Sequence, residues 1–282
     1  MLAGFMLDNY NLDISFTDWM KVGVPLSVTM LPISWLILTK VIYPVNFETS
    51  PETKTLLTEL KNELGKFNGP EVKVFIVFVL TALAWLSRTA LDDIPGLHYL
   101  SDAGIAMISA LVLFLLPSGN SEKKEPLLNW KDAQENVPWG LLVLFGGGLS
   151  LANAVQSTGL AIWLGNLIPG GVSIIIIVVL IVTMIIFLTE LTSNMATTAT
   201  FLPVVAALAL QSNFEPLLVT AAVAIAASCA FMLPVATPPN AIVFGSGLIK
   251  VPQMARAGFL LNIIGIILVS LVAIILVPAF LL

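Results

Sequence analysis

The stretch TELTSNMATTATFLPV, residues 189–204, decides how this chain folds, because it places many polar side chains inside an otherwise apolar tract. Glu190 and Asn194 stand there among several threonine and serine hydroxyls. The apolar tract extends from about residue 172 to about residue 211. A helix needs roughly 20 apolar residues to cross a membrane, so a tract of about 40 residues is long enough to cross twice. The polar side chains lie in its middle, where a crossing pair would have its turn in water.

The composition of the chain is that of a membrane protein. Its 282 residues are 58% hydrophobic and 10% charged, and the mean hydropathy of +1.00 is far above that of soluble domains. We therefore predict an all-α polytopic protein of the cell membrane, in contact with the lipid bilayer. The other tracts that we expect to cross are about 22–43, 74–90, 103–117, 138–163, 216–249 and 256–282.

Several classes of function are excluded by residue types that the sequence does not supply. The charges form no basic stripe, so we predict no nucleic-acid partner. Cys229 is the single cysteine, which excludes an intrachain disulfide and a multi-cysteine metal cluster. The single histidine, His98, is far from the polar stretch, and FGGGLS at 145–150 lacks the lysine of a phosphate loop. We therefore predict that the chain is not an enzyme and that an ion gradient supplies its energy.

The basic residues of the loops orient the predicted spans. Short cytoplasmic loops are enriched in lysine and arginine, and the lysines between the first and second spans and after the third span place those loops inside. Lys250 and Arg256 mark the link before the last span as cytoplasmic. The C-terminus is then predicted to lie outside, and the tract at 172–211 must leave and return on the outer side.

Two arrangements of that tract satisfy this orientation: two full crossings with a cytoplasmic turn, or a re-entrant hairpin whose tip stops at mid-membrane. A cytoplasmic turn predicts a basic residue beside it, and the sequence has none between Lys131 and Lys250. Irregular backbone at membrane depth is tolerated inside protein or against a water-filled cavity, where a tip of Thr, Ser and Asn is suitable. The sequence therefore favours the re-entrant hairpin.

The tip of such a hairpin offers groups for ligands of both charges. If the chain turns near Ser193 and Asn194, one of them caps the second arm, whose free N–H groups favour an anion. The last carbonyls of the first arm, near Thr189 to Thr192, lack helical partners and can face a small cation. The alternative is that the hydroxyls bond back to their own helices while the asparagine joins two spans. Glu190 either supports the cation electrostatically or pairs outside the site.

The stretch CAFMLPVATPPNAIVFGSG, residues 229–247, contains a second interruption. Its prolines lie within one apolar segment, and proline in a helix interior costs about 3 kcal/mol because it has no N–H. We predict that the helix is unwound near Ala236 to Asn240. A plain proline kink is the alternative, but Thr237 and Asn240 add polar groups that repair of a kink does not need. Secondary transporters bind substrate and coupling ion where discontinuous helices meet.

These interruptions carry a resemblance to a known family. LTSNMATTATFLPV at 191–204, FMLPVATPPNAIVF at 231–244 and LVLFGGGLSLANAV at 142–155 resemble the C-terminal half of the divalent anion:sodium symporters, the di- and tricarboxylate transporters. The resemblance extends over essentially the whole chain, from ISFTDWMKVGVPLSVTMLPISWLILTK at 14–40 to the last span. It implies half of an inverted-repeat, elevator-type transporter that works as a homodimer, with one re-entrant hairpin and one discontinuous helix.

The resemblance also implies which residues bind ligands. Substrate carboxylates of the succinate, malate and citrate class would contact Ser193, Asn194 and Met195 of the hairpin, and Thr237 and Pro238 of the unwound helix. Sodium would be the coupling ion, with oxygen ligands from Thr189, Thr192, Asn194, Ala236 and Pro238.

The sequence departs from the family pattern in two places. Met195 stands where many members have threonine, which should tune selectivity more than abolish binding. Residues 1–136 contain no counterpart of the second Ser-Asn-Thr hairpin, so the first sodium site and half of the substrate pocket are missing from this chain.

Three parts follow from the spans and the resemblance. Residues 1–136 are predicted as scaffold-type helices with a cytoplasmic amphipathic arm at about 46–72. Residues 137–255 are predicted as part of a transport domain, and residues 256–282 as the last transmembrane helix. The predicted function is sodium-coupled symport of di- and tricarboxylates, with this chain as the C-terminal half. The alternatives are a transport-incompetent fragment that still dimerises and a symporter of sulfate or another inorganic anion.

Overall fold

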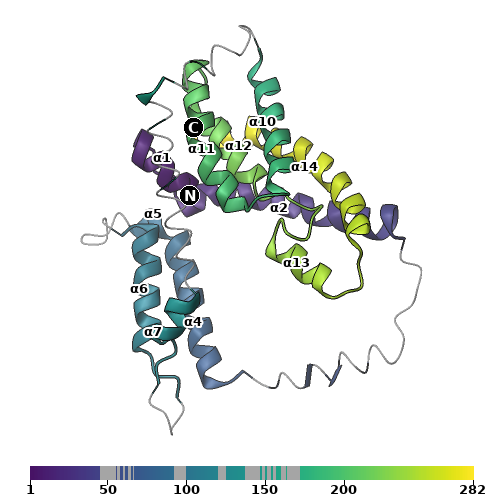
Figure 1. The fold of residues 1–282 in the computed structure, drawn as a ribbon. Helices are drawn as coiled ribbons and strands as arrows, with labels where there is room; N and C mark the ends of the chain where they lie inside the picture. The colour runs from purple at the N-terminus through teal and green to yellow at the C-terminus, as the bar shows by residue number, and fades with distance from the viewer. Residues whose placement is uncertain are drawn as a thin grey trace. The chain divides into compact units, whose positions relative to one another are not determined.

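In the computed structural model, the regular elements of the described residues are helices, apart from an isolated bridge between Pro117 and Pro126 (Figure 1). These residues are 1–44, 67–91, 100–119, 125–136 and 172–282, with single positions between 55 and 65 and between 147 and 163. Contacts group the chain into two units, which are described separately. One contains Met1–Val45 and Trp139–Leu282, and the other contains Asn46–Pro138.

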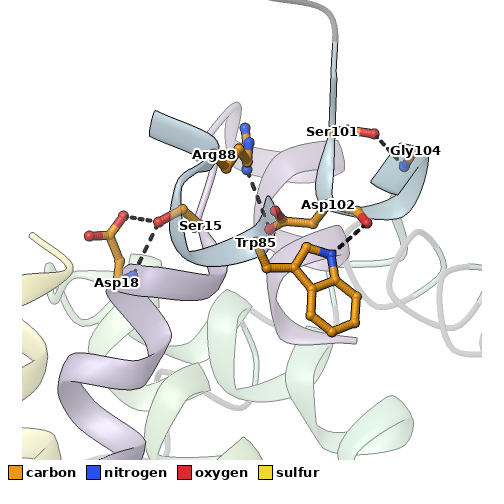
Figure 2. A network of polar contacts seen from close by, with 7 residues as sticks. All are labelled: Ser15, Asp18, Trp85, Arg88, Ser101, Asp102 and Gly104. Carbon is orange, nitrogen blue, oxygen red and sulfur yellow. Dashed lines mark hydrogen bonds and ion pairs between the residues drawn. The ribbon is translucent and has the colours of Figure 1, made fainter. Parts of the chain in front are cut away.

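The first unit begins with α1 (Leu2–Tyr10) and α2 (Phe16–Leu36), and α2 continues into the π-helix η1 (Ile37–Ile42). Ser15 caps α2, because its hydroxyl accepts the N–H of Asp18 at 3.1 Å (Figure 2). The later helices of this unit are α10 (Ile174–Thr189), α11 (Asn194–Gln211), α12 (Pro216–Ala226), α13 (Pro238–Gly245) and α14 (Val251–Phe280).

The core of the first unit surrounds α12. This short helix is apolar on every side and packs against α10, α11 and α14 (Figure 1). A helix that is hydrophobic all round is stable when it is buried. The largest fully buried side chains include Val223 on this helix and Ile185, Ile186, Leu202 and Val269 on the helices around it. The irregular segment that follows α12 therefore starts inside the packed core.

One contact joins the ends of two long helices in this unit. The hydroxyl of Tyr43, directly after η1, donates a hydrogen bond of 2.9 Å to the carbonyl of Gln253 in the first turn of α14. The end of the first span and the start of the last span therefore lie at the same end of the unit. The orientation predicted from the loop charges requires this arrangement.

The second unit contains α4 (Gly69–Leu86), α5 (Arg88–Leu91), α6 (Asp102–Leu115) and α7 (Trp130–Asn136). The hydroxyl of Thr81 on α4 donates to the hydroxyl of Ser109 on α6 at 2.7 Å. Asp102 fixes the start of α6, since its carbonyl accepts Trp85 Nε1–H at 3.0 Å and its carboxylate lies 3.4 Å from Arg88 Nη1 (Figure 2). These contacts hold α4 and α6 together.

Most of the predicted spans are confirmed as apolar helices. Among the described residues, four helices are long and apolar enough to cross a membrane: Phe16–Ile42, Gly69–Leu86, Asn194–Gln211 and Val251–Phe280. Shorter apolar helices cover Asp102–Leu115, Ile174–Thr189 and Pro216–Ala226. Most of the predicted span at 138–163 and of the predicted arm at 46–72 lies outside the described residues.

The predicted unwinding is confirmed at Ala236 and Thr237, but it was wrong for residues 238–240, and the interruption starts earlier than predicted. α12 ends at Ala226, and the backbone is non-helical from there until Thr237. The helix α13 begins at Pro238, so both adjacent prolines lie in its first turn instead of inside the break. The N–H groups of a first turn have no helical acceptor, and the fixed φ of proline suits that position. The prolines therefore end the irregular segment.

The two packing units are a different kind of division from the predicted functional parts. The scaffold assignment of residues 1–136, the transport assignment of 137–255 and the separate last helix at 256–282 stay predictions.

Candidate functional site

The helices α10 and α11 form a hairpin whose turn contains residues 190–193. Ser193 caps α11, because its hydroxyl accepts the N–H of Ala196 at 3.1 Å. The predicted cap is therefore confirmed. The next two N–H groups, those of Asn194 and Met195, begin the helix and have no acceptor within it. They form the positive end of an 18-residue helix.

The polar residues of the turn divide into a buried and an exposed group. Thr189 and Glu190 are buried, whereas Thr192 and Ser193 are exposed and Met195 is 48% exposed. The hairpin tip thus presents Ser193 and Met195 at the surface of this unit.

Three oxygen atoms converge at the base of the tip. The Thr189 hydroxyl oxygen lies 3.0 Å from Asn194 Oδ1 and 3.0 Å from the carbonyl oxygen of Ala227, the residue that follows α12. A hydroxyl has one proton and can donate it to one of these acceptors at a time. The arrangement is therefore rich in oxygen and poor in donors, which suits a small cation. Sequence reasoning missed Ala227, since nothing local marks its carbonyl as a neighbour of Thr189.

Two other hydroxyls of the hairpin bond within the hairpin itself. Thr192 donates to the carbonyl of Leu188 at 3.1 Å, and its oxygen lies 2.5 Å from that of Thr197. Thr198 donates to the carbonyl of Asn194 at 2.7 Å. For these residues, the alternative expected from the sequence is the observed one: the hydroxyls bond back to their own helices.

The polar side chains of the second interruption satisfy its own backbone. The Thr237 hydroxyl accepts the N–H of Asn240 at 3.3 Å and so caps α13. The Asn240 amide donates to the carbonyls of Ala230 at 3.0 Å and Leu233 at 3.1 Å. The interpretation that these residues exceed what repair of the helix needs was therefore wrong. Repair of an irregular segment inside a membrane protein requires such donors, because its carbonyls have no helical partner.

Glu190 connects the hairpin to this irregular segment. The residue is 3% exposed, and its carboxylate accepts the N–H groups of Phe231, Met232 and Leu233 at 2.8 to 3.1 Å. The side-chain amide of Asn262, on α14, donates to the same carboxylate at 2.8 Å. Glu190 therefore faces the interior of the unit, and its partners lie outside the predicted ligand set, so whether it also supports a cation stays a prediction.

The same segment lies directly against α14 at Gly258. A Cβ atom on Gly258 would lie 2.1 Å from the carbonyl oxygen of Phe231 and 2.5 Å from Cα of Met232. No side chain fits there without moving backbone. Gly258 and Asn262 are four residues apart and share one helix face. Sequence reasoning missed both, and the one available signal was a glycine and an asparagine in an otherwise apolar span.

The structure brings together part of the predicted ligand set. Thr189, Thr192, Ser193, Asn194 and Met195 gather at one hairpin tip. Ala236, Thr237 and Pro238 lie where α13 begins. Among the hydrogen bonds of the described residues, those that join the tip to the second interruption end on residues 227 and 231–233. A shared role of all eight residues in ligand binding stays a prediction.

Sequence comparisons agree with this architecture. Residues 1–280 match the family profile described as the sodium:sulfate symporter transmembrane region. A sodium-dependent dicarboxylate transporter, SdcS, of Staphylococcus saprophyticus is 40% identical over 281 residues, which are 99% of this chain and 54% of that protein. The transporter of the same name from Staphylococcus aureus strain USA300 is 42% identical over 281 residues, with the same coverage. The chain therefore spans about half the length of these curated relatives. It is a multi-pass membrane protein and belongs to the divalent anion:sodium symporter family, as the resemblance of its two interruptions predicts.

Proposed function

We propose that this chain supplies the C-terminal half of a transporter that moves dicarboxylate anions together with sodium across the cell membrane. The observation that carries the proposal is the hairpin tip, where a capped helix N-terminus adjoins three converging oxygens. The relatives named as sodium-dependent dicarboxylate transporters support the same assignment.

The anion would bind at the N-terminus of α11. The N–H groups of Asn194 and Met195, the Ser193 hydroxyl and the positive end of the helix dipole all favour a carboxylate. Thr237 and Pro238, at the start of α13, would line the site from the other side. Met195 places an apolar side chain where a further hydroxyl would otherwise bind substrate.

The sodium ion would bind at the base of the tip. Thr189 and Asn194 supply side-chain oxygens there, and the carbonyl of Ala227 adds a third. Thr192, Ala236 and Pro238 complete the ligand set that we propose. Unwound carbonyls and the C-terminal ends of half-helices are the groups that coordinate sodium in secondary transporters.

Coupling between sodium and the anion follows because the proposed sodium site and the proposed anion site adjoin each other at the hairpin tip. Opposite unit charges about 4 Å apart attract by about 4 kcal/mol at an effective dielectric constant of 20. A bound sodium ion therefore lowers the free energy of placing a carboxylate at the neighbouring helix end. The effect is reciprocal, so the anion raises the affinity for sodium by the same factor.

Finer features of the mechanism are part of the same proposal. The arm α10 contains 16 residues, so it is about 24 Å long, shorter than a hydrocarbon core of about 30 Å. This length, and the polar turn without a basic residue beside it, support a re-entrant hairpin. The resemblance supports an elevator motion, a homodimer and tricarboxylates such as citrate as further substrates, and the loop charges support an external C-terminus.

A sodium-replacement experiment tests the proposal. Proteoliposomes that contain the full gene product should take up labelled succinate at least about ten-fold faster in sodium than in choline, given a coupling energy of 1.4 kcal/mol or more. Equal rates in the two salts would remove the coupling. The same assay on the 282-residue chain alone, with chemical crosslinking, separates a competent half from a transport-incompetent fragment that still dimerises.

The family description, which names sulfate, favours a second candidate function. A sulfate carrier predicts that unlabelled sulfate competes with labelled substrate better than unlabelled succinate does. A dicarboxylate carrier predicts the reverse order in the same competition assay.

A further inference from the structure

The Glu190 carboxylate occupies an unusual position for a charged group in a membrane protein. The residue is 3% exposed, and every donor to its carboxylate among the described residues is neutral: the N–H groups of Phe231, Met232 and Leu233, and the amide of Asn262. Both carboxylate oxygens accept, and each of these contacts is made by an N–H donor. The environment therefore suits an ionised carboxylate held by hydrogen bonds alone.

The irregular segment needs such an acceptor. Beyond the end of α12 at Ala226, the N–H groups of residues 231–233 lie in non-helical backbone and donate to the Glu190 carboxylate. An unsatisfied backbone group inside a membrane costs several kcal/mol. Successive N–H groups in irregular backbone form a concave anion site, and here a side chain of the same protein fills that site.

Glu190 is not available as a direct sodium ligand. A carboxylate has about four lone-pair positions, and five contacts of 2.8 to 3.1 Å already approach its two oxygens. Its influence on a ligand must therefore act through the elements that it joins. These are the hairpin turn, the irregular segment and α14.

We propose that Glu190 is a positioning residue that fixes the irregular segment against the hairpin tip. The carbonyl of Ala227 lies four residues before Phe231, and the same attachment keeps it 3.0 Å from the Thr189 hydroxyl oxygen. Without the attachment, the three oxygens at the base of the tip separate. The consequence for sodium affinity rests on the proposed function, whereas the attachment itself does not.

Cys229 provides a readout that needs no transport. It is the single cysteine of the chain, it is 7% exposed, and it lies two residues before Phe231. In the 282-residue chain reconstituted in liposomes, Glu190→Gln should raise the rate at which N-ethylmaleimide modifies Cys229 by about ten-fold or more. The reason is that each 1.4 kcal/mol lost from the free energy that keeps the segment packed raises the population of its open form ten-fold. In Glu190→Gln, an amide NH2 group replaces one of the two acceptor oxygens. This donor group faces the backbone N–H groups, which are also donors, and leaves some of them unpaired.

Matched variants control this measurement. Glu215→Gln makes the same chemical change at an exposed residue whose side chain does not cap its helix, and should leave the rate unchanged. Cys229→Ala gives the background. Glu190→Asp keeps the carboxylate on a shorter side chain, so it should hold the irregular segment in part and give an intermediate rate of Cys229 modification. A wild-type rate for Glu190→Gln would overturn the proposal.

A double variant that moves the carboxylate to the neighbouring side chain shows whether the hydrogen bonds of Glu190 to backbone matter, or only its negative charge. The double variant Glu190→Gln with Asn262→Asp keeps a carboxylate and an amide at this contact, but moves the carboxylate away from the three backbone N–H groups. We expect Cys229 to react as fast in this double variant as in Glu190→Gln. Restoration of the slow wild-type rate would show that negative charge suffices and would overturn the positioning role.

Transport by the full gene product tests the link to the ligand site. Glu190→Gln should raise the sodium concentration for half-maximal succinate uptake by about ten-fold, while uptake stays saturable in sodium. An unchanged half-saturating concentration, together with faster Cys229 labelling, would overturn that link. If the wild type does not transport succinate, the proposed function fails, and the labelling rates still decide whether Glu190 holds the segment.

Discussion

Replacing Asn194 by alanine should abolish sodium-driven dicarboxylate uptake. Asn194 is the first residue of α11, and its Oδ1 atom lies 3.0 Å from the Thr189 hydroxyl oxygen. In the proposed mechanism its side chain serves both the sodium ion and the substrate. Loss of one hydrogen bond to a charged group costs about 1.5 to 3 kcal/mol, so loss of both contacts should lower kcat/KM by about 100-fold or more. Initial rates of succinate uptake over a range of sodium concentrations measure this.

Two further variants show whether the loss of uptake is caused by the change in the proposed binding site. Asn9→Ala removes an exposed asparagine on α1 whose amide donates to the carbonyl of Phe5, and it should leave uptake unchanged. Asn194→Asp should weaken succinate binding by like-charge repulsion while sodium binding is kept. Full uptake by Asn194→Ala would remove the site assignment.

Replacing Gly258 by alanine should be among the most destabilising single changes in the first unit. The added methyl group would lie 2.1 Å from the carbonyl oxygen of Phe231, and the clash is with backbone instead of a flexible side chain. Overpacking of a well-packed interior typically costs about 1 to 3 kcal/mol, occasionally more, and we expect the upper end here. Thermal unfolding in detergent should show a midpoint several degrees below that of the wild type, at roughly 2 to 4 °C per kcal/mol.

The matched control is Gly265→Ala on the same helix. Its added methyl group would lie 3.7 Å from Ile186 Cδ1 and 3.9 Å from Cys229 Cβ, which is ordinary van der Waals contact. Its unfolding midpoint should not fall below the wild-type value, since the methyl group meets no clash and alanine is more stable than glycine in a helix interior by about 0.5 to 1 kcal/mol. Equal midpoints for the two variants would contradict the close approach of α14 and the irregular segment.

The hairpin could be predicted because its signals are local. The Ser193 hydroxyl caps α11 by accepting the N–H of Ala196, three residues away, and the apolar runs on either side set the lengths of the arms. The prolines near 238 indicated an interruption for the same reason. Its position was misjudged because proline both breaks a helix and fits the first turn of the next one, and the sequence does not show which.

The contacts that hold the site together could not be predicted, because they join distant parts of the chain. Glu190 binds backbone N–H groups about 40 positions away and an amide 72 positions away. Those backbone groups are donors whatever their side chains are, so no residue pattern marks them. Gly258 matters through the backbone that lies against it, which the sequence also does not show.

Concentrative uptake tests the central claim most directly. Proteoliposomes containing the full gene product are prepared with equal succinate concentrations inside and outside, so that a sodium gradient is the sole driving force. An inward sodium gradient should accumulate succinate above the starting level, and a sodium ionophore should return it to that level. Accumulation that persists without the gradient, or no accumulation with it, would contradict sodium-coupled dicarboxylate symport.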